Sequence, residues 1–392
     1  MRTVYDSPRA TLGKSSLMTE LAVATTALTT PLAAHFIAAG KHPTLAEYRG
    51  LATPRLLDAP ETETEALARS AAVHDLGWLR HIGVRGEDRF RWLSGMVTNT
   101  VRDLASNSGA WNFVLNAQGR ILGDLTVWRE GDDLEITLDA SQCDPLLAHL
   151  NHFIIMDDVE LIPLGQEPGA EETVLGLTGP AASQVLTRMG LPTLPEPMTA
   201  TRIEYNGLDL CLRRTWGTLA EHYELWTPIA GITRLWRNLC TAGATPAGFA
   251  ALDAFRIAEG IPAYGVDIAE RDLPQETSQT RALHFNKGCY LGQEIVERIR
   301  SRGNVHRHLH ALELDGPLPA SGTEILLSGA PAGHITSAAR LPLPRSPRIF
   351  ALAMLKAEAE THSEPLTFAA EGSTGTARIL ATPPSLSAAT SS

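Results

Sequence analysis

The sequence runs through the same series of predicted elements twice, and this repetition constrains the fold more than any other feature. Residues 81–93 and 175–186 each pass from a short apolar strand through Gly86 or Gly179 into a helix. Residues 134–150 and 223–239 then each read as strand, turn and amphipathic helix. Strand–turn–helix units are common, so coincidence is an alternative explanation. We predict an α+β fold in which two related domains each back a sheet with helices.

From about residue 305 the pattern changes to short segments of alternating apolar and polar residues, separated by Gly and Pro. Regularly spaced short strands of this kind are typical of a small β-barrel or sandwich. We predict a first α+β domain at 18–165, with some exchange of chain between domains, a second at 166–304, and the barrel or sandwich at 305–381. Residues 1–17 and 382–392 lack periodic apolar positions, so we expect a flexible leader and a disordered tail.

The composition indicates which binding partners and which cellular compartment to expect. The 392 residues include 33 basic and 44 acidic side chains, a formal charge of -11. This sign is wrong for a protein that coats DNA or an anionic membrane. The apolar stretch at 21–40 is interrupted by Pro31 and His35 and falls short of the roughly 20 clean apolar residues of a membrane span. We expect a cytoplasmic, reducing setting, because no C-x-x-C pair occurs among Cys143, Cys211, Cys240 and Cys289.

The most distinctive segment is KGCYLGQE. It contains a cation, a thiol, a phenol, an amide and a carboxylate among two glycines. Its candidate residues are Lys287, Gly288, Cys289, Tyr290, Gly292, Gln293 and Glu294. The glycines permit tight turns or close approach of a ligand, and a lysine near a thiol can stabilise the thiolate. Cys289 as a nucleophile would need a base such as His284 or His306. The alternative is a loop leading into a capped helix, with Cys289 as a small buried hydrophobe.

A dense basic run follows this segment, formed by Arg298, Arg300, Arg302, His306, Arg307, His308 and His310. It could attract an anionic cofactor or RNA, although a solvated face is the commoner explanation of such a run. The three histidines alternate, so on a strand they would all face one way and could in principle bind zinc. Because no second cluster of ligands accompanies them in the sequence, we predict no metal site.

KGCYLGQE, followed by an Arg-rich turn with Gly303, resembles the signature of the YgfZ family, folate-binding proteins that assist iron–sulfur enzymes. From about 30 to 380 the chain is similar to the wider superfamily of the glycine-cleavage aminomethyltransferase, or T-protein. The likeness rests on segments such as SAAVHDLGWLRHIGVRG at 70–86 and LNAQGRILGDLTV at 115–127. It implies two related α+β domains around a central folate-sized opening, a C-terminal β-barrel, and tetrahydrofolate or a derivative as cofactor.

The resemblance also implies roles for residues outside the motif. Glu224 would grip the pterin ring, Arg256 would hold the folate carboxylates or nearby backbone, and Tyr264 would line the pocket. Asn116 and Arg120 lie on the matching hairpin. Judged by the residues alone, Arg256 could instead pair with Glu259 along its helix, and Glu224 could lie on the surface of an edge strand.

The chain departs from the T-protein pattern at two places. T-proteins carry an aspartate after the asparagine of a Thr-Asn-Asp segment, where it assists aminomethyl transfer, but Thr100 follows Asn99 here. A threonine hydroxyl has no charge with which to orient a cationic amine. The usual Arg-x-Glu-x-Gly is shifted as well, because its acidic residue is Glu259 and Ala258 stands in the usual place.

From these features we predict a folate-binding accessory protein for the maturation or repair of iron–sulfur enzymes, with Cys289 as its functional residue. Its partners would be iron–sulfur assembly proteins or client enzymes. One alternative is an enzyme, a tetrahydrofolate-dependent aminomethyltransferase or demethylase. Another is a tRNA-modification factor that uses the basic run at 298–310.

Overall fold

The computed structural model describes residues 28–303, 305–343, 346–362 and 364–386. The predicted leader at 1–17 and the end of the predicted tail at 387–392 lie outside the described residues. Residues 382–386 are described, and Leu386 is buried in a cluster with core residues of the sheet and the barrel. Within the described part of the chain, no helix combines the length and the apolar character that a membrane span needs.

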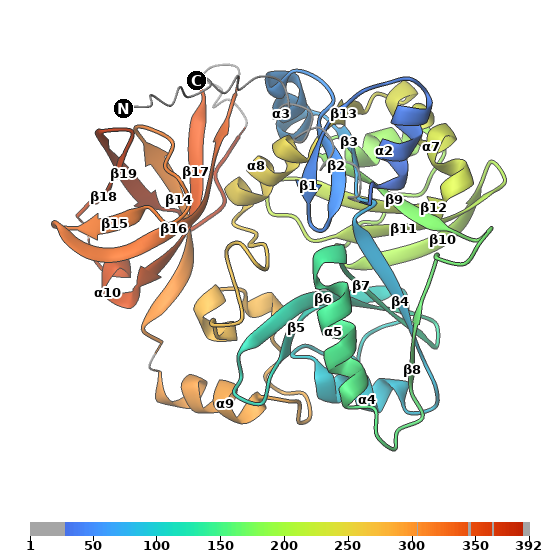
Figure 1. Ribbon diagram of the computed structural model, residues 1–392, viewed down its shortest axis with the longest axis horizontal. Helices are drawn as coiled ribbons and strands as arrows, with labels where there is room; N and C mark the ends of the chain where they lie inside the picture. Colours follow the sequence, from blue (N-terminus) through green and yellow to red (C-terminus); the bar gives the residue numbers. More distant parts are fainter. Residues whose placement is uncertain (1–27, 304, 344–345, 363, 387–392) are drawn as a thin grey trace, which may run out of the picture.

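An eleven-stranded sheet forms the larger body of the molecule, on the right of Figure 1. In spatial order its strands are β13 (Thr245–Ala247), β3 (Ala72–Asp75), β9 (Glu172–Gly179), β12 (Glu221–Pro228), β11 (Leu208–Thr215), β10 (Thr199–Tyr205), β5 (Ser108–Leu115), β6 (Ile121–Glu130), β7 (Asp133–Asp139), β4 (Leu79–Arg85) and β8 (Glu160–Pro163). β10 and β5 share one register pair, Thr199 with Ser108. We therefore distinguish a first half-sheet, β5 to β8 in this order, from a second half-sheet, β13 to β10. β3 precedes every strand of the first half-sheet in the chain but pairs within the second.

Each half-sheet contains the repeated unit that the sequence predicts. β4 leads through Gly86 into α4 (Arg89–Met96), and β9 ends at Gly179 before α6 (Ala182–Arg188). A Cβ atom would lie 2.0 Å from the Asp158 carbonyl oxygen at position 86 and 2.3 Å from the Ser70 carbonyl oxygen at position 179. Both glycines are therefore required by close backbone contact. β7 leads into α5 (Ala140–His152) and β12, through the short η2 (Ile229–Gly231), into α7 (Ile232–Thr241), which confirms the α+β prediction.

The remaining elements surround the sheet. The first elements of the described residues are α2 (Pro31–Ala38) and a two-stranded ribbon of β1 (Thr44–Tyr48) and β2 (Leu51–Leu56), followed by α3 (Pro60–Arg69). α8 (Phe249–Glu259) packs against α3, β2 and the barrel strands, and so joins the two bodies. Short helical turns η3 (Pro274–Thr277) and η4 (Thr280–Ala282) lead to α9 (Gln293–Arg302), which lies below the barrel in Figure 1.

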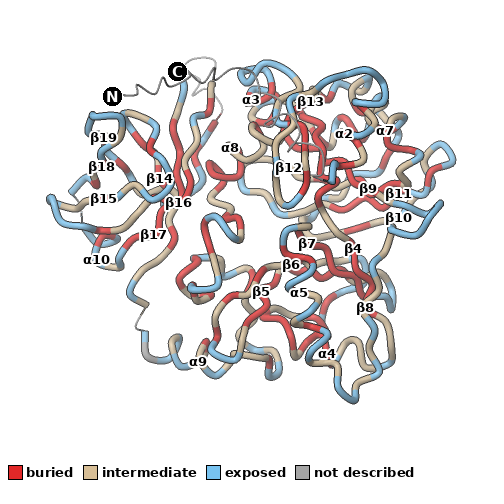
Figure 2. The backbone as a smooth tube through the Cα atoms, viewed as in Figure 1, coloured by how far each residue is buried: buried red, intermediate tan, exposed pale blue. Residues whose placement is uncertain are grey.

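The C-terminal part is a closed barrel of six strands, as the resemblance implies, rather than a sandwich. Its order is β14 (Arg307–Asp315), β17 (Arg348–Lys356), β16 (Ala330–Leu341), β15 (Glu324–Leu327), β18 (Leu366–Ala370) and β19 (Ser373–Ile379), with α10 (Ala357–Glu360) after β17. Pairing of β14 with β19 closes it. Alternate residues such as Leu312, Ile325 and Phe368 fill the interior, and buried stretches alternate with exposed turns along the barrel in Figure 2.

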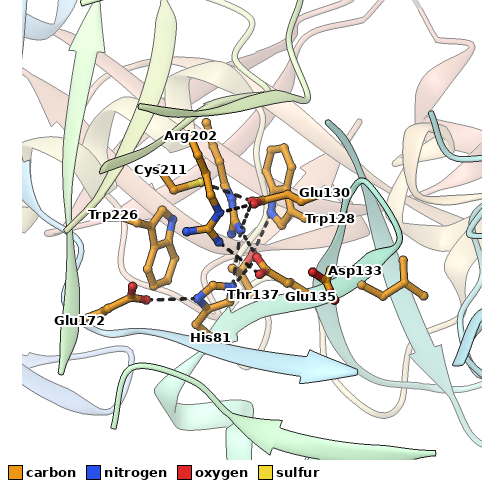
Figure 3. A network of polar contacts seen from close by, with 12 residues as sticks. His81, Trp128, Glu130, Asp133, Glu135, Thr137, Glu172, Arg202, Cys211 and Trp226 are labelled. Carbon is orange, nitrogen blue, oxygen red and sulfur yellow. Dashed lines mark hydrogen bonds and ion pairs between the residues drawn. The ribbon is translucent and has the colours of Figure 1, made fainter. Parts of the chain in front are cut away.

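A buried ion-pair network holds the two half-sheets together (Figure 3). Arg213 of β11 is fully buried and pairs with Glu130 of β6, at 3.0 Å, and with Glu135 of β7. Arg202 of β10 pairs with Glu130 at 2.5 Å, and His81 of β4 lies 2.7 Å from Glu135. A buried guanidinium is costly unless it is paired. The second half-sheet provides the arginines, and the first half-sheet provides the glutamates that pair with them.

Candidate functional site

A cavity of about 240 Å³ lies between the two half-sheets. Asp124 and Asp139 line it from the first half-sheet, whereas the second half-sheet and the α8 region provide an acidic, imidazole-rich wall. That wall includes His74, Thr178, His222, Glu224, Arg256 and Glu259, and Trp111, Trp216 and Arg281 complete the polar and aromatic lining. Two of the sequence-predicted folate residues, Glu224 and Arg256, are therefore brought together in one cavity.

The second half-sheet places a row of residues in register beneath the cavity. His74 of β3 lies opposite Gly176 of β9, which lies opposite Glu224 of β12. Residues opposite one another in a sheet project from the same face. A Cβ atom on Gly176 would lie 1.9 Å from Cε1 of His74, so the imidazole occupies the space that a side chain on β9 would fill. The histidine and the glutamate thus share one face without a side chain between them.

Glu224 has the properties of a ligand-binding carboxylate. It lines the cavity, and its Oε2 accepts a hydrogen bond from Trp226 Nε1 at 2.9 Å. Burial raises the pKa of Glu224, against the opposing effect of the Arg213 charge. A carboxylate has about four acceptor positions, so Glu224 retains capacity for the paired N–H donors of an amino-pyrimidine edge. It is not the surface residue of an edge strand that the sequence left open, because β12 lies between β9 and β11.

Arg256 lines the cavity but is largely committed to the protein itself. Its Nε donates to Asp253 at 2.7 Å, and its Nη1 donates to Asp267 at 2.7 Å and to the Ile261 carbonyl oxygen at 3.0 Å. The pairing with Glu259 considered from the sequence is not formed, because Asp253, one turn earlier, is the helical partner instead. Arg256 therefore fixes α8 to the loop that follows it and shapes this end of the cavity.

Arg281 was not predicted from the sequence, yet it lines the cavity as a cation that is available to a ligand. Its guanidinium lies 4.4 Å from the ring centre of Trp111 and 5.5 Å from that of Trp216. Burial lowers its pKa to about 10. Nε donates to Gln279 at 3.2 Å, and we find no protein acceptor within the described residues for the two terminal nitrogens. An arginine with free donors between aromatic faces is suited to a carboxylate or an aromatic amide.

Asp124 is the second residue that the sequence did not single out. This carboxylate on β6 accepts hydrogen bonds from Trp111 Nε1 at 2.7 Å and from Gln142 Nε2 at 3.0 Å. Burial raises the pKa of Asp124, and the charge of Asp139 adds to the effect. A half-buried carboxylate held by two neutral donors can stabilise a cationic amine that forms inside the cavity.

A chain of hydrogen bonds runs along the cavity wall from Glu259 to His74. Oε1 of Glu259 accepts from the backbone nitrogens of Thr218 and Leu219, both at 3.0 Å, and contacts His222 Nε2 at 3.1 Å. The Thr178 hydroxyl lies 3.2 Å from His222 Nδ1 and 3.0 Å from His74 Nε2.

The Glu259 carboxylate, at one end of this hydrogen-bond chain, can only accept. It therefore determines the direction in which the other groups of the chain donate. His222 donates from Nε2 to Glu259, so in its neutral form this ring accepts at Nδ1 from the Thr178 hydroxyl. That hydroxyl then accepts from Nε2–H of His74. Burial, with a smaller effect of His222, lowers the pKa of His74 to about 3, so this ring is neutral. Its Nδ1 is a buried acceptor for which no partner exists among the described residues, and it is suited to an N–H group of a ligand.

The KGCYLGQE motif lies outside the cavity lining. Lys287 Nζ donates to the carbonyl oxygens of Val97 and Asn99, both at 2.6 Å, and burial lowers the pKa of this lysine to about 7. Cys289 is exposed, so its interpretation as a small buried hydrophobe is wrong. Gly288 has open space around its Cα atom. The motif therefore presents its thiol to solvent while its lysine is tied to the segment at 97–99.

The second half of the motif caps α9 and packs on the β5–β6 turn. Burial raises the pKa of the Tyr290 phenol to about 12, and Gln293 Oε1 accepts from the Tyr290 backbone nitrogen at 3.2 Å. Gly292 has φ 81°, and a Cβ there would lie 2.7 Å from the Asn116 carbonyl oxygen. Glu294 forms an exposed pair with Arg298 at 2.7 Å.

The three remaining predicted folate residues stabilise local structure outside the cavity lining. Asn116 Oδ1 accepts from the backbone nitrogens of Gln118 and Arg120, both at 3.0 Å, and so closes the β5–β6 turn. Arg120 donates to the Arg271 carbonyl oxygen at 2.5 Å. The Tyr264 hydroxyl lies 3.4 Å from the Ile121 carbonyl oxygen.

Asn99 connects the motif to the cavity. Its carbonyl accepts from Lys287, and its side-chain Nδ2 donates to the carbonyl oxygens of Trp111, at 3.0 Å, and Arg281, at 2.8 Å. Thr100, which stands in place of the T-protein aspartate, donates its backbone N–H to Asn99 Oδ1 at 2.8 Å and does not belong to the lining. The cavity itself is lined by two aspartates, Asp124 and Asp139.

Comparison with known proteins gives consistent matches. Residues 26–287 match the model of the GCVT N-terminal domain family. A protein named aminomethyltransferase from Rubrobacter xylanophilus is 28% identical over 306 residues, covering 76% of this chain and 80% of the relative. One of the same name from Geobacillus sp. is 24% identical over 346 residues, covering 86% and 93%. The crystal structure of the glycine cleavage system aminomethyltransferase T from Bartonella henselae shares the fold, with a TM-score of 0.80 at 20% identity over 91% of this chain and 98% of that one.

Proposed function

Because the chain belongs to the GCVT N-terminal domain family, we propose that it is an aminomethyltransferase-type protein that binds tetrahydrofolate in the cavity between its half-sheets. The observation that carries this proposal is Glu224, a half-buried carboxylate with spare acceptor positions on the cavity wall. The relatives named aminomethyltransferase support the same class.

The lining provides a partner for each part of a reduced folate. Glu224 accepts from the amino-pyrimidine edge, and His74 Nδ1 accepts from an N–H group of the reduced ring. The volume of about 240 Å³ suits the pterin ring rather than the whole molecule, so the tail extends outward past Trp111, Trp216 and Arg281. Arg281 then binds the aromatic amide or a tail carboxylate through its free donors.

Asp124 supplies the charge that one-carbon transfer requires. In an aminomethyl transfer the carbon passes from a donor to a folate nitrogen through a cationic iminium-like state, which a nearby carboxylate stabilises electrostatically. Thr100 carries no such charge, whereas the half-buried Asp124 lines the cavity itself. The enzyme alternative therefore has a candidate carboxylate after all, and we place it ahead of the accessory role.

The accessory role remains a second candidate because one observation favours it. Cys289 is exposed within a motif that the protein anchors firmly through Lys287. A solvent-facing thiol outside the folate cavity has no evident part in aminomethyl transfer, but it is accessible to a partner protein such as an iron–sulfur client.

Calorimetric titration of the full chain with tetrahydrofolate tests the shared premise, followed by assay of methylene-tetrahydrofolate formation from an aminomethyl donor. Binding with turnover supports the transferase. Binding without turnover supports the accessory role, and absence of binding overturns both.

A further inference from the structure

Two of the three alternating histidines in the basic run meet a glutamate from a distant part of the chain. On β14, His308 and His310 project from one side while Leu309 between them is buried on the other. His308 lies opposite Leu355 of β17, and α10 begins directly after that strand. The chain therefore returns over the two histidines and places Glu360 beside both.

We propose that His308, His310 and Glu360 form a binding site for a divalent transition-metal ion, with zinc as the best-suited ion. The three potential ligand atoms all lie within 4.8 Å of one another. Oε1 of Glu360 is 2.5 Å from His308 Nδ1 and 3.2 Å from His310 Nε2. Tetrahedral ligands of zinc lie roughly 3.3 Å apart, so small side-chain movements suffice to enclose an ion.

The orientation of the two imidazoles suits coordination. Their ring centres are 6.3 Å apart and the ring planes are inclined by 86°, so the rings do not stack. His310 Nε2 is buried and forms no hydrogen bond within the described residues, although Glu360 is near. A buried imidazole nitrogen that makes no hydrogen bond is costly, and a metal ion would satisfy it.

The chemistry of the donors selects the class of ion. Two imidazole nitrogens and one carboxylate oxygen form the set that zinc and related transition ions prefer, whereas Mg²⁺ and Ca²⁺ prefer oxygen alone. Three protein ligands leave a fourth position open. A cavity of about 1110 Å³ adjoins the cluster, lined by His310 and Glu360 and by charged side chains of both signs, among them Glu364, Arg348 and Arg378. It leaves room for water or another ligand in the fourth position.

An ordinary ion pair is the competing explanation, and it responds to pH in the opposite direction. An ion pair needs a protonated imidazole and therefore strengthens as the pH falls. Metal binding needs neutral imidazoles, so protons compete with the ion and affinity falls with the pH.

The experiment is a calorimetric titration of chelator-treated full-length protein with ZnCl₂ at pH 7.5 and 5.5. Cys289→Ser serves as the background, because its exposed thiol is an independent zinc ligand. We expect one ion per chain, with weaker binding at pH 5.5. His310→Ala and Glu360→Gln should each weaken binding at least about tenfold. His306→Ala, in the same stretch but outside the cluster, should leave affinity unchanged.

Substitution with Co²⁺ gives a second measurement that does not depend on folding of one variant. The parent protein should show the visible absorption of a tetrahedral nitrogen–oxygen site, and Glu360→Gln should lose it while its circular dichroism stays unchanged. No stoichiometric binding in the Cys289→Ser background overturns the proposal. Equal weakening by His306→Ala and His310→Ala overturns it as well.

Discussion

His74 and Glu224 occupy one face of the second half-sheet on either side of Gly176, and the imidazole of His74 fills the space above that glycine. The glycine thereby determines the shape of the cavity floor. A methyl group at this position would compete directly with the ring of His74.

Gly176→Ala should therefore destabilise the protein and weaken tetrahydrofolate binding. The added Cβ would lie 1.9 Å from His74 Cε1, so the buried ring must move, at a cost of about 1 to 3 kcal/mol in unfolding free energy. Gly95→Ala is the control, since a Cβ there meets nothing within 4 Å and alanine favours the surrounding helix α4. Denaturant unfolding and calorimetry measure both effects. If Gly176→Ala had the unfolding free energy and the tetrahydrofolate affinity of the wild type, the packing of His74 over Gly176 would be contradicted.

Glu224→Ala should weaken tetrahydrofolate binding by about 1.5 to 3 kcal/mol, because the donors of the pterin edge lose a charge-assisted partner. This corresponds to roughly a ten- to hundredfold rise in Kd. Glu221→Ala, on the same strand but directed to the opposite face, is the matched control and should bind as the wild type does. Unchanged affinity of Glu224→Ala in calorimetry would remove this residue from the site.

Thr178→Val should break the hydrogen-bond chain while keeping the side-chain volume. Nε2–H of His74 then loses its acceptor, and we expect a loss of about 1 to 3 kcal/mol in unfolding free energy and weaker folate binding. Thr215→Val changes another cavity threonine and should alter stability by less than about 0.5 kcal/mol. Nitrogen NMR of labelled histidines reports the tautomer directly. A His74 that carries its proton on Nδ1 in the wild type would refute the polarity assigned to the chain.

His74 should make stability depend on pH in the acid range. The folded pKa is lowered from 6.5 to about 3, so below pH 6.5 the unfolded chain binds a proton that the folded chain does not. The contribution of the neutral ring is thus fully present above pH 6.5 and is lost as the pH falls toward 3, at about 1.4 kcal/mol per unit of difference. His74→Gln, neutral throughout, should flatten this slope, whereas the exposed-site variant His42→Gln should retain it. Parallel profiles of His74→Gln and the wild type would argue against a buried neutral ring.

Cys289→Ser should leave both fold and folate affinity unchanged, because the thiol is exposed and lies outside the cavity lining. If the accessory role operates, cells that depend on this protein should nevertheless lose activity of their four-iron enzymes. Cys240→Ser is the control for general effects of cysteine replacement. Normal enzyme activities in the Cys289→Ser strain would leave the transferase as the remaining candidate.

Local patterns were sufficient to predict the repeated strand–turn–helix units and the short C-terminal strands. The glycines at 86 and 179 mark strand-to-helix turns that close backbone contacts require, and the alternation after residue 305 predicts short strands. Closure into a barrel depends on the pairing of β14 with β19, which no local pattern contains. The resemblance to a known family was needed to predict it.

The cavity was predictable only in part. Glu224 and Arg256 were identified through the resemblance, and both line the cavity. Asn116, Arg120 and Tyr264 do not belong to this lining, and the side chain of Asn116 closes a turn, so their part in folate binding stays a prediction. Arg281 carries no local signal, because its value as a ligand depends on two tryptophans far away in the sequence.

Contacts between side chains that are far apart in the sequence could not be predicted from it. The contacts of Thr178 with His74 and His222 join residues 104 and 44 positions apart. Likewise, Glu360 completes the cluster with His308 from 52 positions away, which is why alternating histidines alone did not justify a metal site. Only the pairing of strands brings these groups together.

The junction of β10 and β5 has a mechanical consequence. Among the described residues these strands share a single register pair, so the halves of the large body meet at a seam that the Arg213 ion pairs secure and no continuous ladder spans. A hollow located on such a seam can widen or narrow as the halves tilt, without breaking any strand ladder within either half. A ligand bound between the two half-sheets would then fix the angle between them.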